Sequence, residues 1–215
     1  MTQNDIFDLI SKGAVQDLTD LLRKNPDVIH KKNEKRLTPL HHAAGEGNVR
    51  MVKLLLASGA NPRAGDQYGY PAINSAVWDG HYDVIKVLID TLVVKSQSAS
   101  ALMITAAERG HEAIIELALD HGAFVDIGDG LGQTPLIYAI RKNQVGIVKI
   151  LIARGADVNY QFNDETPLSV ATQPEIVKLL KKAGAKLPPK KKKKAEFPML
   201  GPASKRLRGA KKNKQ

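Results

Sequence analysis

The sequence predicts an all-α solenoid, in which short antiparallel helix pairs stack along one direction. In the best-defined segment, from Thr38 to Asn61, Thr-Pro-Leu-His opens an apolar helix, a glycine turns the chain, and a second apolar helix leads to Gly-Ala-Asn. Such stacking is required because one short helix pair cannot bury its own apolar face. Related segments begin 30 to 34 residues apart, at Asn4, Thr38, Pro71, Ala101, Thr134 and Thr166.

This unit resembles the ankyrin repeat, which opens with Thr-Pro-Leu-His and leaves its second helix through Gly-Ala-Asn or Gly-Ala-Asp. The match is clearest in 38–61 and 134–159. The resemblance implies about six helix-turn-helix units, including two end caps, joined by β-hairpin loops over residues 1–186. Residues 187–215 form a separate segment in this interpretation.

The first two units differ in their opening residues. The first unit, 4–24, lacks Thr-Pro-Leu-His and alternates apolar with charged positions, as expected of an N-terminal cap with one solvent-facing side. In the second unit Thr38 can cap the first helix, and Pro39 occupies a position whose missing N–H costs nothing. Gly47 then supplies the turn.

The third unit has Pro-Ala-Ile-Asn from Pro71 in place of Thr-Pro-Leu-His, and it carries the only tryptophan, Trp78. The fourth unit departs further from the pattern. Residues 92–100 are rich in serine and three residues short of a normal connection. We therefore expect this connection to lack a regular hairpin and to be the weak point of the stack.

The fifth unit returns to the pattern at Thr134. Its preceding loop, 128–134, contains three glycines and superficially resembles a phosphate-binding loop, but it lacks the lysine of a Walker motif. It also falls where a repeat hairpin must turn, and we interpret it as a turn. The sixth unit begins at Thr166, omits three residues at its turn, and ends at Gly184 as a C-terminal cap.

The composition argues against an enzyme and against a cofactor. There is no cysteine, and the histidines lack the spacing that holds a metal. His41, His81 and His111 fall on framework positions, where the resemblance implies hydrogen bonds to neighbouring loops. No apolar run approaches the roughly 20 residues that span a bilayer. We expect a soluble, monomeric, non-enzymatic protein of the nucleus or the cytoplasm.

The positive charge is concentrated at one end of the chain. Residues 186–215 hold 12 of the 32 lysines and arginines and a single acid, whereas the rest of the chain carries 20 basic and 21 acidic side chains. Proline, glycine and lysine dominate this segment, and such a composition cannot bury enough apolar surface to fold. The sequence therefore predicts a neutral repeat body and a disordered basic tail.

The resemblance implies that a partner protein binds the hairpin tips and the concave face of the first helices. We expect Tyr68, Tyr70 and Trp78 to anchor it, with Arg109 beside them, because such residues dominate interface energetics. The alternative for each ring is packing under its own hairpin. The expected partner-binding positions are Glu34, Lys35, Leu37, Glu46, Gln67, Tyr68, Tyr70, Trp78, Asp79, Glu108, Arg109, Leu131, Gln133, Arg141, Lys142, Phe162 and Asn163.

The basic tail fits three mechanisms beside a merely solubilising role. Its two clusters resemble a bipartite nuclear import signal, which implies binding to a nuclear import receptor. The same cations could bind RNA or DNA phosphates without reading bases, or an anionic membrane surface. The residues concerned are Lys190, Lys191, Lys192, Lys193, Lys194, Lys205, Arg206 and Arg208.

The leading hypothesis is therefore a protein–protein adaptor that the tail directs to the nucleus. One rival is a nucleic-acid-associated protein, whose tail grips RNA or DNA while the repeats recruit a partner. Another is a host-directed effector made by an intracellular bacterium. The sequence names neither the partner nor the organism.

Overall fold

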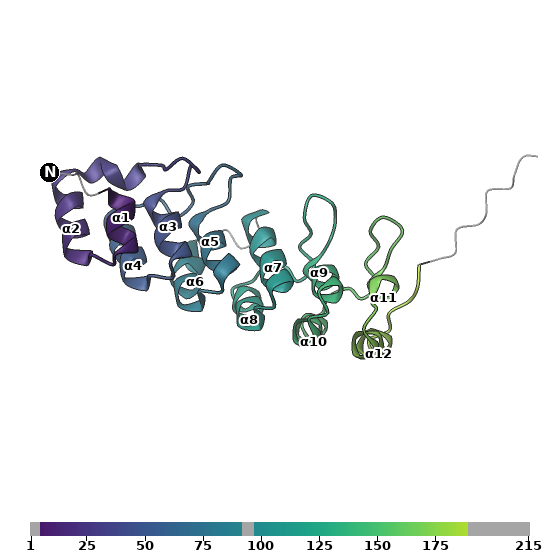
Figure 1. Cartoon of the computed structure of the whole chain (residues 1–215). Helices are drawn as coiled ribbons and strands as arrows, with labels where there is room; N and C mark the ends of the chain where they lie inside the picture. The colour runs from purple at the N-terminus through teal and green to yellow at the C-terminus, as the bar shows by residue number, and fades with distance from the viewer. Residues whose placement is uncertain (1–4, 92–96, 189–215) are drawn as a thin grey trace, which may run out of the picture.

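Six pairs of antiparallel helices stack in one elongated row within the part of the chain that the structure describes (Figure 1). The structure, a computed structural model, describes residues 5–91 and 97–188. The first helices are α1 (Ile6–Ser11), α3 (Pro39–Gly45), α5 (Ala72–Asp79), α7 (Gln97–Arg109), α9 (Pro135–Arg141) and α11 (Pro167–Val170). The second helices are α2 (Val15–Lys24), α4 (Val49–Ala57), α6 (Tyr82–Leu88), α8 (Glu112–Asp120), α10 (Val145–Ala153) and α12 (Pro174–Lys182). Two 3-10 turns, η1 (Pro26–His30) and η2 (Ile89–Thr91), follow α2 and α6. The predicted all-α solenoid is confirmed.

One continuous apolar core runs through the row, from Ile6 in α1 to Leu180 in α12. The second unit shows the repeating arrangement: Ala43 of α3 and Met51 and Leu55 of α4 have no exposed surface. Small alanines on the first helices allow neighbouring first helices to approach closely. Each helix pair therefore buries its apolar face against the next pair.

The two ends of the row are polar, as the sequence predicts. In α2, Leu18 and Leu22 are buried while the remaining positions are half-buried or exposed. In α12, Ile176 and Leu180 are buried, and Lys178, Lys181 and Lys182 are exposed. A terminal repeat needs such a face because its outer side has no neighbour.

The Thr-Pro-Leu-His motif ties the second unit to the third. The imidazole of His41 is only 2% exposed, and its Nδ1 accepts a hydrogen bond from the backbone N–H of Thr38 at 3.3 Å. Its Nε2–H donates to the carbonyl oxygen of Tyr70 at 2.9 Å. His41 thus fixes both the start of α3 and the loop that precedes α5.

The turn glycines form a second set of contacts between units. A Cβ on Gly47 would lie 2.6 Å from Nδ1 of His81, and one on Gly80 would lie 2.7 Å from Cε1 of His111. His81 also donates from Nε2 to the carbonyl oxygen of Gly45 at 2.8 Å, which confirms the loop-bonding role expected of it. Nε2 of His111 is buried without a partner, so His111 keeps the packing role but not the hydrogen bond.

The loops between units are held by side-chain turns rather than by β-strands. Asn33, Asp66 and Asp129 each accept hydrogen bonds from two backbone N–H groups, two and four residues later. Within the described residues, the only β-bridge is the isolated one between Phe162 and Glu165. The predicted hairpin loops therefore turn back on themselves without forming strands: one backbone hydrogen bond crosses the tip, as from Asp66 to the Tyr70 carbonyl at 3.0 Å, and the Asx turn takes the place of a ladder.

The connection before α7 differs from the expected one. α7 begins at Gln97, four residues before the expected start at Ala101, so residues 97–100 are helical rather than irregular. Residues 92–96 lie outside the described part of the chain, as do 1–4 and the tail, 189–215, with all its predicted import or nucleic-acid residues. Only 89–96, which include η2, separate α6 from α7, whereas 58–71 and 121–134 separate the corresponding helices of neighbouring units. The fourth unit therefore has no room for a full loop.

We predict that Gly47→Ala destabilises the protein more than Gly59→Ala does. Both glycines have positive φ, so alanine costs about 1 kcal/mol of backbone strain at either position. At Gly47 the new Cβ also displaces the His81 ring and its hydrogen bond, which adds roughly 1–2 kcal/mol, whereas Gly59 has open space. Urea unfolding measures both values, and equal losses would contradict the role given to the ring.

We also predict that His41 makes the protein less stable as the pH falls. Burial is the main cause that lowers the pKa of His41 below its ordinary value of 6.5. Below that value the unfolded chain takes up a proton that the folded chain refuses, so stability is lost at up to about 1.4 kcal/mol per pH unit. His41→Gln, which can still cap the helix, should show a smaller loss in free energy of unfolding between about pH 7.5 and 5.5. An unchanged pH dependence would show that His41 does not contribute.

Candidate functional site

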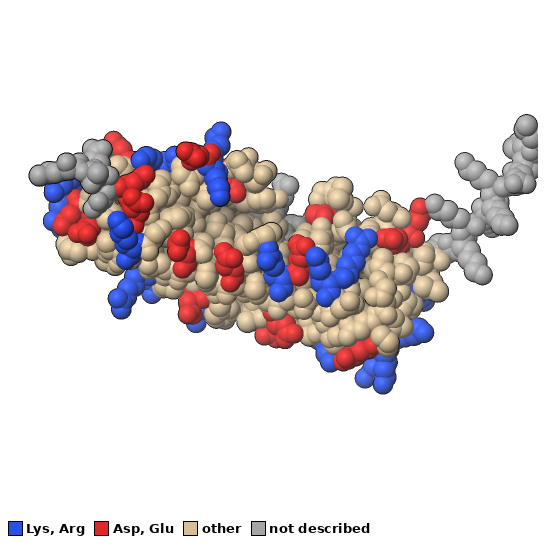
Figure 2. Space-filling model, in the orientation of Figure 1, with Lys and Arg blue, Asp and Glu red and all other residues tan. Residues whose placement is uncertain are grey.

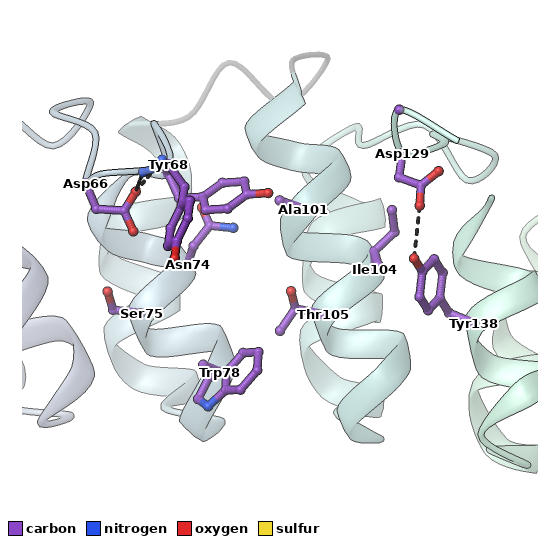
Figure 3. Close-up of a pocket in the computed structure, with 12 residues that line it drawn as sticks. Asp66, Tyr68, Asn74, Ser75, Trp78, Ala101, Ile104, Thr105, Asp129 and Tyr138 are labelled. Atoms are coloured by element: carbon purple, nitrogen blue, oxygen red, sulfur yellow. Dashed lines mark hydrogen bonds between the residues drawn. The ribbon is translucent and has the colours of Figure 1, made fainter. Parts of the chain in front are cut away.

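A groove of about 530 Å³ opens over the inner side of α7. Its floor is formed by α7, one wall by α5 and the loop 65–70, and the other wall by residues around Asp129 and Tyr138 (Figure 3). We call it the α7 groove. Its volume is within the range of sites that bind small molecules or short peptide segments.

The tyrosine loop, residues 65–70, supplies two exposed rings. Asp66 Oδ1 accepts hydrogen bonds from the backbone N–H groups of Tyr68 at 2.8 Å and Tyr70 at 3.0 Å. The imidazole of His41 donates a further hydrogen bond to the carbonyl oxygen of Tyr70. Tyr68 is 75% exposed and Tyr70 42% exposed, and their ring centroids lie 6.5 Å apart. The loop backbone is thus fixed while its rings face solvent.

Trp78, near the end of α5, lies on the same wall, at the end of the groove away from the tyrosine loop (Figure 3). It is 53% exposed, and the guanidinium carbon of Arg109 lies 3.7 Å from the indole centroid. A cation–π contact of this kind contributes about 0.5–1 kcal/mol at an exposed site. The structure therefore brings together Tyr68, Tyr70, Trp78 and Arg109, the four residues that the sequence predicts as the anchor.

The floor of the groove was missed by sequence reasoning. Ala101, Ile104 and Thr105 of α7 line it, together with Asn74 and Ser75 of α5. The signal was present, because positions i, i+3 and i+4 share one face of a helix. The ankyrin resemblance instead predicted binding by Glu108 and Arg109, at the end of α7, and not by this face.

The far wall contains a carboxylate that is held in its charged form. Asp129 Oδ1 accepts from two loop N–H groups, and Oδ2 accepts from the Tyr138 hydroxyl at 2.9 Å. Burial alone would raise the pKa of Asp129, but these hydrogen bonds together hold it below its ordinary value. Burial and the bond to Asp129 raise the pKa of Tyr138 to about 12. Neither residue was among the predicted site residues.

Three predicted charged residues at the ends of α7 and α9, Glu108, Arg141 and Lys142, form ion pairs. Lys142 lies 3.0 Å from Glu108, and Arg141 lies 3.0 Å from Glu165 and also donates to the side chain of Gln133. Figure 2 shows acidic and basic side chains interspersed along the row, without one large patch of a single sign. A partner bound here must compete with these exposed pairs, each of which contributes roughly 0–1 kcal/mol.

Other predicted positions are not among the residues that line the groove. Lys35 is exposed and Leu37 half-buried on the loop before α3, and Glu46, at the end of α3, lies 3.8 Å from His42. Leu131 is 70% exposed at a loop tip, next to the groove-lining Gly130. The exposed positions that no contact above describes are Glu34, Gln67, Asp79 and Asn163.

Phe162 is buried, with 6% of its surface exposed, so it does not present its ring to a partner. The backbones of Phe162 and Glu165 exchange two hydrogen bonds, and the tip residues between them take positive φ. This tight tip places Phe162 at the base of the loop, where the Arg141 guanidinium lies 5.3 Å from its ring.

The structure gives no support to a phosphate site in the loop 128–134. The backbone N–H groups of Leu131 and Gln133 bind the Asp129 side chain, and that of Gly132 binds its carbonyl oxygen. The loop is therefore a turn, as interpreted from the sequence. In residues 5–91 and 97–188 there is no group of three histidine or acidic side chains that could hold a metal ion, and no helix there could cross a membrane.

Comparison with known proteins gives one consistent result. The family model described as Ankyrin repeats (3 copies) matches residues 7–98 and 90–162. The chain is 31% identical to the B-cell lymphoma 3 protein homolog of Mus musculus over 70% of its own length. It spans only 35% of the length of that relative.

Two solved structures have the same fold. The ankyrin repeat domain of human ASB11 superposes with a TM-score of 0.75 at 25% identity, covering 84% of each chain. An ankyrin repeat domain from Acinetobacter baumannii superposes with a TM-score of 0.75 at 28% identity, covering 86% of this chain and all of the other. Ankyrin repeats generally form non-enzymatic scaffolds for protein–protein interaction. With its repeats matched over most of the length, the chain belongs to the ankyrin repeat family.

Proposed function

We propose that the protein is a non-enzymatic adaptor, which acts as a monomer and captures a partner protein in the α7 groove. The observation that carries this proposal is the cluster of Tyr68, Tyr70 and Trp78, whose rings are largely exposed on one side of the repeat row. Monomeric proteins seldom leave several aromatic rings uncovered in one place without a binding function. Tyrosine, tryptophan and arginine also dominate the energetics of protein interfaces.

The walls of the groove support protein capture over catalysis. Asp129 and Tyr138 are bonded to each other, and the shifts in their pKa move both away from neutral pH. Neither group is therefore poised to exchange a proton with a substrate at pH 7. The same fixed walls suit binding, because a partner need not order them.

We propose further that the basic tail directs the adaptor to the nucleus. This proposal rests on the two clusters, Lys190–Lys194 and Lys205 to Arg208, and on their position beyond the last repeat. An import receptor reads an extended chain with closely spaced cations, which this composition favours. Binding of the tail to RNA or DNA phosphates is the competing function.

We predict that Trp78→Ala weakens partner capture about tenfold or more, as expected of a central interface aromatic. The measurement is photo-crosslinking in cells from a reactive group placed at Gln67, a loop position next to the groove. The matched control is Tyr82→Ala, which removes an aromatic ring of 39% exposure from α6, in the row of second helices. Equal crosslinking in the unsubstituted protein, Trp78→Ala and Tyr82→Ala would reject the groove as the binding site.

We predict that replacing Lys190–Lys194, Lys205, Arg206 and Arg208 by glutamine removes a large fluorescent fusion of the full chain from the nucleus of eukaryotic cells. Unchanged nuclear signal would remove the proposed role of the tail. The competing function has a different signature: affinity for RNA or DNA should fall with a slope of about 0.9 in log salt for each phosphate contacted.

A further inference from the structure

The α7 groove lies where the row of loops is interrupted. Loops of full length precede α5, α9 and α11, at residues 58–71, 121–134 and 154–166, but only residues 89–96, which include η2, separate α6 from α7. In the neighbouring units such a loop stands over the start of the first helix. Between Tyr68 and Asp129, the inner face of α7 lines an open groove instead.

Asn74 marks the same interruption on α5. It occupies the position that His41 holds in α3, three residues after the capping position. His41 reaches the next loop and binds the Tyr70 carbonyl, whereas the amide oxygen of Asn74 is buried without a hydrogen-bond partner. Figure 3 shows Asn74 beneath the tyrosine rings, with its amide group directed toward α7. An unpaired amide at this point can pair with the backbone of an incoming segment.

The charge of the groove favours a cation. Asp66 and Asp129 lie on opposite walls, and no lysine or arginine is among the residues that line the groove. The described cations at its margins are engaged: Lys32 binds the Gly65 carbonyl at 3.0 Å, Arg109 covers the Trp78 ring, and Arg141, near Tyr138, pairs with Glu165 at 3.0 Å. Asp129 is ionised at neutral pH because its hydrogen bonds stabilise the carboxylate.

The shape of the groove suits a long side chain with an apolar stem. Ala101 lies on the side of α7 that faces the Tyr68 ring, and Ile104 lies on the side that faces Asp129 and Tyr138, so the two provide an aliphatic floor across α7 (Figure 3). Lysine and arginine bury their methylene groups along such a surface and keep the charged head near a carboxylate. The head belongs at the loop end of the groove, because Arg109 repels a second cation at the Trp78 end.

We propose that the α7 groove binds an extended segment of a partner protein through one arginine or lysine side chain. The aliphatic stem lies on Ile104, the cationic head pairs with Asp129, and the segment's backbone lies beside Asn74, in the place that a loop takes in the neighbouring units. This inference rests on the proposed adaptor function and names the chemistry of its partner.

The test is selection of random peptides of about 12 residues on the full-length chain, at physiological salt. The selected peptides should share a lysine or arginine, and replacing it by glutamine should weaken binding about fivefold, which is the upper end of what an exposed charge pair contributes. In Asp129→Asn that difference should shrink to less than about twofold. Asparagine can still accept from the loop N–H groups, so the loop is preserved. The matched control, Asp83→Asn, removes an exposed charge from α6 and should leave the fivefold difference intact.

The outcomes separate this inference from the proposed function. Peptides that require Tyr68 and Trp78 but share no basic residue would overturn the inference and leave the adaptor function standing. If the affinity of the selected peptides is unchanged when Tyr68 and Trp78 are replaced, the groove is not the adaptor site either.

Two other occupants would also overturn the inference. Binding that emerges only after the tail lysines 190–194 are replaced by glutamine would assign the groove to the chain's own tail. A dimer in sedimentation experiments that Tyr68→Ala disperses would assign it to a second copy of the chain.

Discussion

The structure depends on burial that is shared between neighbouring units. α1 has 6 residues, α3 has 7 and α11 has 4, whereas isolated helices shorter than about 12–15 residues are marginal in water. Their stability must therefore come from the apolar faces that one unit presents to the next. Because this coupling acts only between neighbours, a departure from the pattern in one unit need not disturb the units farther along the row.

Polar contacts set the distance and register of that stacking. Each links adjacent units: His41 of the second unit holds the loop of the third, and His81 of the third fills the space beside Gly47 of the second. Such a contact requires both partners. The fourth unit lacks the full loop, and the third unit has asparagine at position 74 where the second has histidine. The short connection and the asparagine at position 74 are therefore consistent with each other, because a histidine there would have no full loop to bind.

The sequence predicts the repeat number, the helix order and the apolar core because these follow from local patterns. Thr38, Pro39 and Gly47 mark helix ends by their own backbone preferences, without reference to the rest of the chain. It also predicts that Tyr68, Tyr70, Trp78 and Arg109 lie together, since framework positions define one face of the row. The strand-free loops and the helical residues 97–100 were not predicted, because side-chain turns and an early helix start depend on tertiary context. Phe162 was misplaced for a similar reason: the tightness of its loop tip decides which way the ring faces.

The groove itself could not be read from any single repeat. It lies between the loops at Asp66 and Asp129, which belong to the third and fifth units, so three consecutive units must be placed before it appears. Its carboxylates are bound to their own loops, and Tyr70 is held by His41, so the backbone of both walls is fixed before a partner arrives. A site with fixed walls loses little conformational entropy on binding, and it discriminates by charge and shape rather than by adaptation. The proposed recognition surface therefore lies in the unit that departs most from the repeat pattern.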